Sequence, residues 1–187
     1  MNPRLKALFI VLIGSFAAFS CVDPDQTQEV LLEKDKEAIE KYLLENPIPS
    51  VKEFSEPVEG FYMFWEVSVD SELNNLLRGD TVKVDYTGKL LSNKVFDTSI
   101  EQIAKDNGIF VANRNYQPLR FAVGYGIAIS GFEFALSLMR EGEKATVIFP
   151  SRLGYGTQPN GPVPANSPLV FELNLLEVRN GLNHLNP

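Results

Sequence analysis

The spacing of hydrophobic residues changes at about residue 61. Between residues 29 and 45, apolar side chains recur every three or four positions, which predicts an amphipathic helix over Glu29–Glu45. Thr27 is its expected N-cap, and Pro47 and Pro49 end it. After residue 61 the pattern changes to short runs rich in aromatic and β-branched residues, which predict strands. The expected strands are Phe61–Val69, Thr81–Leu91, Leu119–Val123, Ala145–Phe149 and Leu169–Val178.

A second amphipathic segment lies between the third and fourth of these runs. It predicts a helix over Phe132–Arg140, bounded by Gly131 and Gly142. Five strands with one long helix late in the order cannot form alternating βαβ units. The sequence therefore predicts an α+β fold in which an antiparallel sheet wraps around a single helix.

The first helix has one apolar stripe and one charged face. Two uses of the stripe remain open: it packs on its own domain or acts as a spacer, or it serves as a dimerisation arm that makes a homodimer through residues 29–45. Its acidic residues lie among lysines, so we expect them on a solvated face and not as a catalytic pair. The stripe is Leu31, Leu32, Ile39, Tyr42 and Leu43, and the acidic residues are Glu33, Asp35, Glu37 and Glu40.

The N-terminus has the pattern of an export signal. Arg4 and Lys6 precede an apolar run over 7–19 that is too short for a comfortable membrane span, and the only cysteine, Cys21, follows. This resembles a bacterial lipoprotein box, so residues 1–20 are expected to be a signal peptide and Cys21 the lipidated residue. An uncleaved anchor, or ordinary secretion with a free thiol, is the alternative. Residues 21–58 then form a tether with the first helix, starting with a flexible polar leash, and the protein is lipid-anchored in the bacterial cell envelope, in the outer membrane facing the periplasm or the surface.

Composition excludes several kinds of chemistry. The 187 residues include 24 acidic and 17 basic side chains, a net charge of −7, which disfavours nucleic acid as a partner. One cysteine excludes an intrachain disulfide and a cysteine-rich metal site. The single histidine, His184, leaves no Ser–His or Cys–His pair unless the tail folds back. We therefore expect any catalysis here to work without a nucleophile.

Six sequence blocks carry a family resemblance. They are Val84–Gly88 (VDYTG), Val95–Ser99 (VFDTS), Phe121–Gly124 (FAVG), Ile129–Glu133 (ISGFE), Pro150–Gly156 (PSRLGYG) and Leu169–Leu173 (LVFEL). In this order they resemble a peptidyl-prolyl cis-trans isomerase of the FKBP type, over about Phe61–Val178. The resemblance places an isomerase domain at 59–181 and a tail at 182–187. It implies a half-barrel sheet with the helix Phe132–Arg140 across its concave face and a groove between them.

The resemblance also implies which residues form the site. The backbone N–H of Ile129 and the hydroxyl of Tyr155 would donate to substrate carbonyls. Phe132 stands where the family usually has Trp, and Leu119 where an aromatic residue is usual. The expected catalytic residues are Tyr86, Phe96, Asp97, Ile129, Phe132, Tyr155 and Phe171, with Leu119, Ala128 and Val163 as further substrate contacts.

These residue types suit amide rotation. A planar amide resists rotation with a barrier of roughly 18–20 kcal/mol, and its polar carbonyl is stabilised by water. A dry aromatic pocket therefore favours the twisted form by differential binding, without covalent or proton-transfer steps. Asp97 is expected to position the pocket and a substrate group and not to act as a general base. The other rings are expected in the core: Phe61, Trp65, Phe121, Phe134 and Phe149.

Two segments depart from a minimal member of the family. The spacing Ser99–Gln102 predicts a capping box, followed by a short helix over Ile100–Asp106 that ends at Asn107-Gly108. The insert that follows, with Ile109, Phe110 and Tyr116, either covers a sheet edge or forms a flap that contacts an unfolded client. The proline-rich stretch Gly156–Pro168 is expected to be a rim loop at the pocket mouth.

The resulting hypothesis is a prolyl isomerase that acts on Xaa-Pro bonds and needs no cofactor, metal or ATP. Its expected partners are proline-containing unfolded or nascent envelope polypeptides and, through the N-terminal lipid, a membrane. A non-catalytic holdase that uses the same groove, and a structural envelope lipoprotein whose first helix is the working part, are the alternatives.

Overall fold

The computed structural model describes residues 27–70 and 76–184. The predicted signal peptide 1–20, the lipidation site Cys21 and most of the polar leash lie outside the described residues and stay predictions. None of the described helices is long and apolar enough to cross a membrane.

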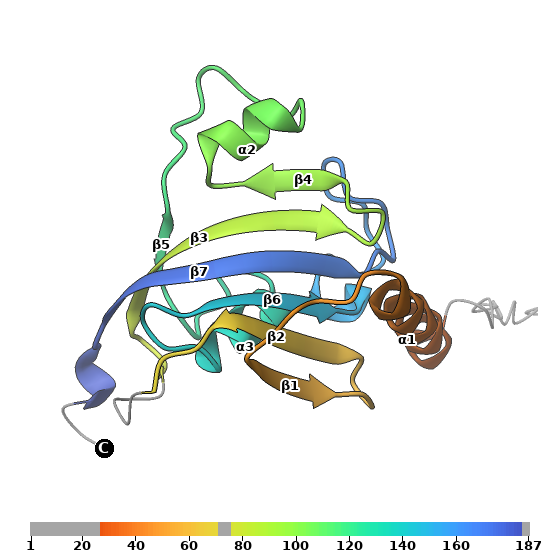
Figure 1. The fold of residues 1–187 in the computed structure, drawn as a ribbon, viewed down its shortest axis with the longest axis horizontal. Coiled ribbons are helices and arrows are strands. Elements are labelled where there is room, and N and C mark those ends of the chain that lie inside the picture. The colour runs from red at the N-terminus through yellow and green to blue at the C-terminus, as the bar shows by residue number, and fades with distance from the viewer. Residues whose placement is uncertain (1–26, 71–75, 185–187) are drawn as a thin grey trace, which may run out of the picture.

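A single antiparallel sheet of seven strands organises the described chain (Figure 1). The order is β1-β2-β6-β7-β3-β4, and β5 also pairs with β3. Every neighbouring pair is antiparallel. The strands are β1 (Lys52–Glu56), β2 (Phe61–Val67), β3 (Thr81–Leu90), β4 (Val95–Thr98), β5 (Leu119–Ala122), β6 (Lys144–Phe149) and β7 (Leu169–Arg179).

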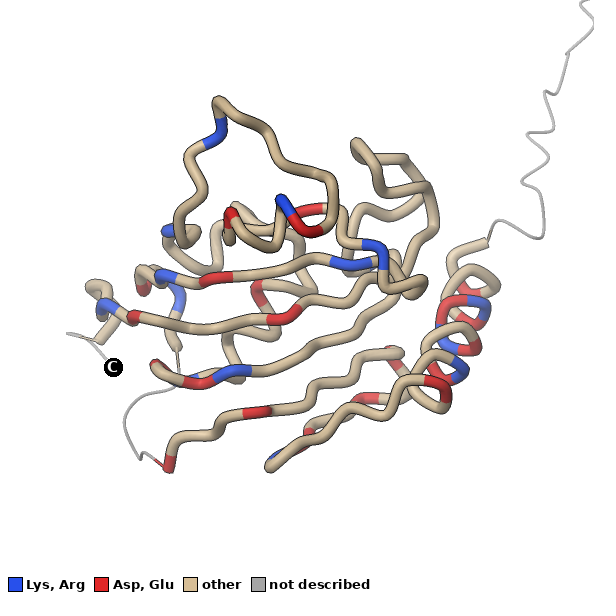
Figure 2. The backbone as a smooth tube through the Cα atoms, turned by 45° about the horizontal axis from the view of Figure 1, so that its top comes forward, with Lys and Arg blue, Asp and Glu red and all other residues tan. Residues whose placement is uncertain are grey.

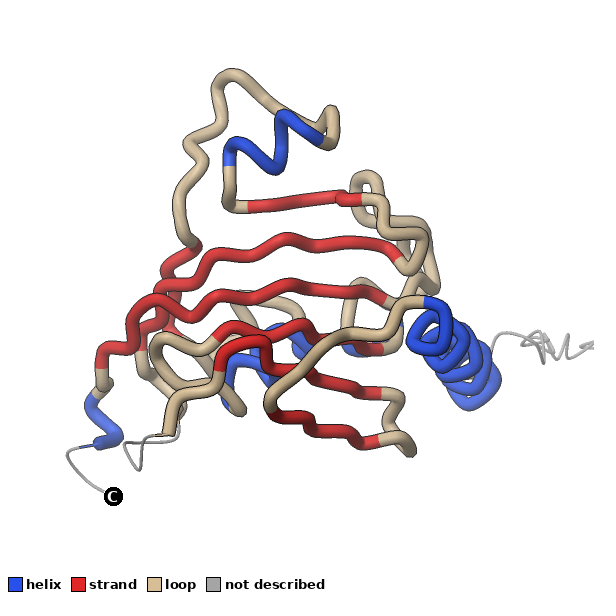
Figure 3. Tube along the Cα trace, in the orientation of Figure 1, coloured by secondary structure: helices blue, strands red, loops and turns tan. Residues whose placement is uncertain are grey.

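The part of the chain that the structure describes contains three α-helices, which lie at different places around the sheet. Helix α3 (Ser130–Ser137) lies against the inner face, where its buried residues join the main core. Helix α1 (Gln28–Glu45) lies at the end of the sheet, and α2 (Glu101–Asp106) lies beside the edge strand β4 (Figure 3). This arrangement confirms the predicted α+β fold with an antiparallel sheet around one helix.

The two-residue period of the strands separates an inner face from an outer face. On β2 the inner residues Phe61, Met63 and Trp65 are buried in the main core. Tyr62 and Phe64, which alternate with them, pack in a second cluster with α1. The main core is therefore enclosed between the sheet and α3, and the site residues arise from this inner face.

Helix α1 uses its apolar stripe within its own chain. Ile39 and Tyr42 pack on Ile148 and Val170 of the outer face, and Thr27 caps the helix by accepting from the Val30 N–H at 3.3 Å. This favours the intradomain alternative, whereas the homodimer through residues 29–45 stays a prediction. Charged residues are spread along the whole length of α1 (Figure 2), and all of them except Asp35 and Lys36 are exposed.

The expectation for Asp35 is wrong. The sequence pattern predicts it on the solvated face, yet the side chain is only 5% exposed. It lies on the stripe between Leu31 and Ile39, where Ser151 supplies two hydrogen bonds that compensate for burial.

All five expected strands are present, with ends shifted by at most two residues, and two strands were missed. The side chains of β1 are largely exposed, and buried and exposed positions do not alternate clearly along it. Its sequence therefore has no strand pattern. It starts the sheet before the boundary predicted at residue 59. β4 has only four residues. The helix expected over Phe132–Arg140 starts at Ser130 and ends at Ser137.

The predicted capping box does not form. Helix α2 starts at Glu101, and its N-cap residue is Ile100, which has no side-chain cap. The Ser99 hydroxyl instead donates to Asp85 at 2.7 Å. The helix does end at Asn107, followed by Gly108 with φ of 68°.

The C-terminal segment folds back onto the domain. Asp80 is fully buried and accepts from the Gly181 N–H at 2.7 Å, while a His184 ring nitrogen lies 2.8 Å from its other oxygen. Burial opposes ionisation of Asp80, but hydrogen bonds from Gly181, His184 and Leu77 outweigh it and lower its pKa. The histidine is therefore engaged with a structural carboxylate.

Candidate functional site

Five aromatic side chains meet on the inner face of the sheet. Phe171 of β7 is central: its ring centroid lies 5.3 Å from Phe132 and 5.6 Å from Phe96, both nearly perpendicular. Tyr86 lies 6.3 Å from Phe171, and Tyr155 lies 6.5 Å from Phe96. We call these five residues the aromatic cluster. The structure thus brings together every aromatic residue predicted for the site.

A glycine in β3 allows two of these rings to meet. Gly88 is paired with Phe171 across the β3–β7 ladder. A Cβ atom at this position would lie 2.6 Å from Cζ of Phe96 and 2.9 Å from Cε1 of Phe171. Because real Cβ contacts are longer than this, any side chain at Gly88 would displace a ring of the cluster.

The exposed edge of the cluster carries a polar group of three side chains. The Tyr86 hydroxyl donates to Oδ2 of Asp97 at 2.7 Å. Arg114 donates to Oδ1 of Asp97 at 2.5 Å and to the Thr98 carbonyl at 3.0 Å. Both oxygens of Asp97 are therefore occupied, which supports the positioning role expected for it over a general-base role.

The phenol of Tyr86 is kept protonated by its surroundings. Burial raises its pKa, and the hydrogen bond to Asp97 and the negative charge of that carboxylate raise it further, well above the ordinary value of 10. The pKa of Tyr155 is raised as well, first by burial and then by the charge of Asp97. Both hydroxyls therefore remain hydrogen-bond donors at neutral pH.

Arg114 is a site residue that the sequence analysis missed. It comes from the insert after β4, whose helix α2 contacts that edge strand. The insert thus covers a sheet edge and also places the Arg114 guanidinium in the site, beside Asp97. Phe110 and Tyr116 of the same insert stack on each other with ring centroids 5.7 Å apart, and Phe110 is 41% exposed.

The start of α3 presents the backbone donor expected at Ile129. Ile129 is the N-cap residue, with φ of −61° and ψ of 148°. Glu133 accepts from the N–H groups of Gly124 and Ala128 at 2.9 and 3.1 Å, which fixes the turn before Ile129. Within residues 27–70 and 76–184 the Ile129 N–H makes no hydrogen bond. Glu133 is a second residue whose role was missed, although it belongs to a quoted block.

The remaining predicted residues also lie in or against the same core. Val163 is 2% exposed, although it comes from the proline-rich loop, while Leu119 and Ala128 are partly buried against the core. Tyr155 and Ile129 are half-buried in the same way. The accessible edge of the aromatic cluster is therefore formed by Tyr86, Asp97, Ile129 and Tyr155, because Phe132 and Phe171 are each only 3% exposed.

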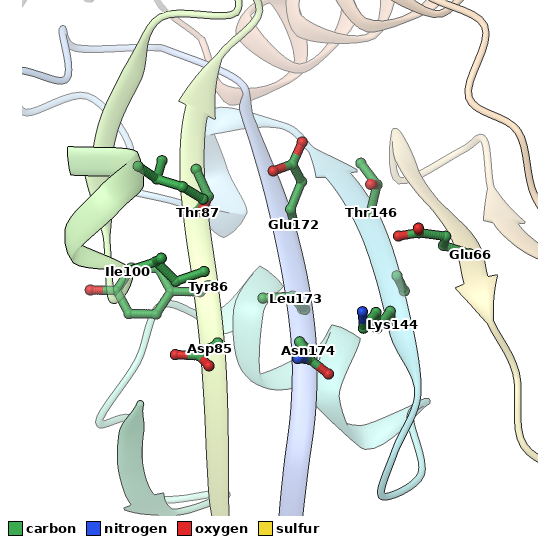
Figure 4. A pocket seen from close by; sticks show the side chains of 12 residues that line it. Glu66, Asp85, Tyr86, Thr87, Ile100, Lys144, Thr146, Glu172, Leu173 and Asn174 are labelled. Atoms are coloured by element: carbon green, nitrogen blue, oxygen red, sulfur yellow. The ribbon is translucent and has the colours of Figure 1, made fainter. Parts of the chain in front are cut away.

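A separate cavity of about 280 Å³ lies on the outer face of the sheet, between α2 and β2 (Figure 4). Its lining combines polar and apolar side chains and includes acids and a lysine with no nucleophile–base pair. Of the predicted site residues only Tyr86 also borders it. Its principal lining residues are Glu66, Asp85, Thr87, Ile103, Lys144, Glu172 and Asn174.

The described residues contain no group of three or more histidine, cysteine, aspartate or glutamate side chains able to hold a metal ion. The chemistry that the aromatic cluster offers is apolar contact with a flat or ring-shaped group. Its edge adds hydrogen-bond donors for carbonyl oxygens.

Comparison with known proteins identifies the class. The sequence model of the FKBP-type peptidyl-prolyl cis-trans isomerases matches residues 74–176, more than half of the chain. The chain belongs to this family, as the six sequence blocks indicated.

The individual relatives named here are peptidyl-prolyl cis-trans isomerases as well. The chain is 48% identical over 84 residues to the short-type peptidyl-prolyl cis-trans isomerase of Methanocaldococcus jannaschii, which covers 45% of this chain and 53% of that protein. It is 37% identical over 102 residues to the human peptidyl-prolyl cis-trans isomerase FKBP2, covering 54% and 63%. The match thus spans about half of the first relative's length.

Solved structures show the same fold. A peptidyl-prolyl cis-trans isomerase from Pseudomonas syringae pv. tomato is 26% identical, with a TM-score of 0.57 over 83% of this chain and 98% of that one. FkpA from Escherichia coli is also 26% identical, with a TM-score of 0.56 over 79% of this chain and 58% of that one.

Proposed function

We propose that this protein catalyses cis-trans isomerisation of Xaa-Pro bonds at the aromatic cluster. The observation that carries the proposal is the joint placement of five aromatic rings beside the Tyr86–Asp97–Arg114 group. Family membership supports it.

The mechanism follows from the polarity of the amide. The planar amide has a polar carbonyl that water solvates, whereas the twisted transition state has lost amide resonance and is less polar at oxygen. Apolar rings around the proline replace that water, so they bind the twisted form better than the planar form. Each 1.4 kcal/mol of this difference gives about a tenfold gain in rate.

The polar edge orients the substrate. In this proposal the Ile129 N–H and the Tyr155 hydroxyl donate to carbonyl oxygens next to the proline. Tyr86 and Arg114 hold Asp97, so that its carboxylate stays fixed at the side of the rings. None of these groups gains or loses a proton during the rotation.

The test is the rate of cis-to-trans conversion of a short Xaa-Pro peptide with the full chain. We expect clear acceleration, and about a fivefold lower kcat/KM for Tyr155→Phe because one donor to the substrate is lost. Tyr125→Phe, at a 59% exposed ring, is the matched control and should leave kcat/KM unchanged. Absence of acceleration by the parent chain refutes the proposal.

A holdase function is the second candidate, because large apolar side chains are exposed on the insert and on the turn before α3. Val111 is 55% exposed and Ile127 61%. A holdase would suppress aggregation of an unfolded protein without accelerating the proline-limited phase of its refolding. An isomerase accelerates that phase at catalytic concentrations, so one refolding experiment separates the two functions.

We further propose that the natural substrates are exported envelope polypeptides and that the protein is anchored by a lipid on Cys21. The basic and apolar pattern of residues 1–20 supports this. We expect Cys21→Ala to move the protein from the membrane fraction to the soluble fraction, because one lipid-modified residue supplies the attachment. Unchanged membrane association of the variant would contradict the lipid anchor.

A further inference from the structure

An acidic side chain of α1 is buried against the segment that carries Tyr155. Asp35 is 5% exposed, and its Oδ2 atom accepts from both the backbone N–H and the hydroxyl of Ser151, at 2.8 and 2.6 Å. Burial raises the pKa of Asp35, while the two hydrogen bonds oppose that shift. Burying a carboxylate costs free energy unless it is hydrogen-bonded. The two hydrogen bonds from Ser151 therefore offset this cost and hold the two residues in a defined geometry.

Ser151 begins the turn that leads to Tyr155. Its carbonyl accepts from the N–H groups of Gly154 and Gly156, both at 2.8 Å, so Tyr155 lies between two backbone groups tied to Ser151. A Cβ at Gly154 would lie 2.8 Å from Leu169, so this backbone is pressed against β7. A displacement of the Ser151 backbone would therefore also displace Tyr155.

The contact between α1 and this turn is incompletely packed. Beside the Asp35–Ser151 contact, a cavity of about 280 Å³ is bordered by residues of α1 and of the segment, among them Leu31, Asp35, Tyr155 and Asn166. The side-chain oxygen of Asn166 is buried and has no hydrogen-bond partner among the described residues. Asp35 is thus the polar attachment across a region that is not fully packed.

The other end of α1 is attached to the turn between β3 and β4. The Tyr42 hydroxyl donates to the Asn93 side chain at 2.8 Å, and Asn93 donates to Asn46 at 3.1 Å. That turn leads directly to Phe96 and Asp97. Helix α1, which precedes the family match at 74–176, therefore touches both the segment that carries Tyr155 and the turn that leads to Phe96 and Asp97.

We propose that Asp35 is a positioning residue that holds Ser151 so that the Tyr155 hydroxyl is fixed for the substrate carbonyl. Helix α1 is then a working part of the isomerase and not a spacer. The inference rests on the proposed function. It adds a residue from outside the matched region to the machinery of the site.

A double-mutant cycle on the full chain tests this. We expect Asp35→Ala to lower kcat/KM about fivefold in the parent and by less than about 1.5-fold in the Tyr155→Phe background, because the two residues act through the same group. Asp35→Asn keeps an accepting oxygen and should retain at least half of the parent kcat/KM. Glu37→Ala, at an exposed position of the same helix, should change nothing. Equal losses in both backgrounds would show a purely structural role and overturn the inference.

A second measurement does not depend on activity. Amide hydrogen exchange of Gly156, whose N–H donates to Ser151, should become at least tenfold faster in Asp35→Ala and stay unchanged in Glu37→Ala. Should Asp35→Ala fail to fold, Ser151→Ala takes its place, because it removes the hydroxyl donor and keeps the backbone donor. We expect it to lower kcat/KM and to speed exchange of the Gly156 amide, each by less than the change given above for Asp35→Ala. Unchanged exchange overturns the positioning role even where the chain is inactive, whereas inactivity with faster exchange refutes only the proposed function.

Discussion

Replacing Glu143 with alanine is expected to lower the free energy of unfolding by about 3–5 kcal/mol, because it breaks a buried hydrogen-bond network. Glu143 is 0% exposed, and its Oε2 atom accepts from the Trp65 indole N–H and the Arg140 N–H, both at 2.9 Å. Its Oε1 atom accepts from the Ser68 hydroxyl at 3.0 Å and the Val69 N–H at 3.1 Å. The substitution leaves all four donors without their acceptor, and the indole of Trp65 is itself buried.

Urea unfolding at pH 7 measures this change. Glu66→Ala, at an exposed position on β2, is the control and should change the free energy of unfolding by less than about 0.5 kcal/mol. A loss below about 1.5 kcal/mol for Glu143→Ala would show that water replaces the carboxylate at little cost.

The loss should also depend on pH. Burial opposes the charge of Glu143, but the hydrogen bonds from Arg140, Val69, Trp65 and Ser68 outweigh it and lower its pKa below 4.5. A lowered pKa in the folded state means that the ionised carboxylate stabilises the fold above the unfolded value and that this contribution disappears as the pH falls through the folded value. The difference between the parent and Glu143→Ala should therefore shrink below about pH 4.5.

The aromatic part of the site could be predicted because strand periodicity and the family blocks specify the same positions. Tyr86 and Phe171 lie on strands whose alternation fixes the face that each side chain occupies. Asp35 carried a local signal that was overlooked. Leu31, Asp35, Ile39 and Tyr42 follow the helical period, so the stripe itself placed the carboxylate on the buried face. Its charge nevertheless favoured a solvent-exposed position, because no residue close in sequence indicates a buried partner. The partner, Ser151, lies 116 residues further along the chain.

Arg114 could not be found in this way. It lies in an irregular part of the insert, and no period relates it to Asp97, 17 residues earlier. Its contact depends on the path of the loop after α2, which local sequence does not determine. β1 was missed for a related reason. Its largely exposed side chains give no alternation, and its pairing with β2 comes from the short connection between them.

Replacing Phe171 with alanine is expected to reduce kcat/KM on an Xaa-Pro peptide at least about tenfold, equivalent to about 1.4 kcal/mol of transition-state stabilisation. The ring is 3% exposed and lies within 6.3 Å of the Tyr86, Phe96 and Phe132 rings. Its removal takes away the centre of the apolar wall and leaves space that water or a neighbouring ring fills. Water at the site then solvates the polar carbonyl of the planar amide, so the preference of the site for binding the twisted amide is reduced.

Loss of stability alone must be separated from this effect, because a buried Phe→Ala substitution costs about 3–5 kcal/mol wherever it is made. Phe61→Ala is the matched control. Phe61 is 1% exposed and stacks on Phe149 with centroids 6.3 Å apart, so its ring belongs to the same core one layer away from Phe171. Both variants should unfold at similarly lowered urea concentrations. At a temperature where circular dichroism shows both folded, Phe61→Ala should keep kcat/KM within about twofold of the parent, because the rings that face the substrate remain in place. Equal losses of activity in the two variants would mean that general core integrity, and not a ring-lined site, sets the rate.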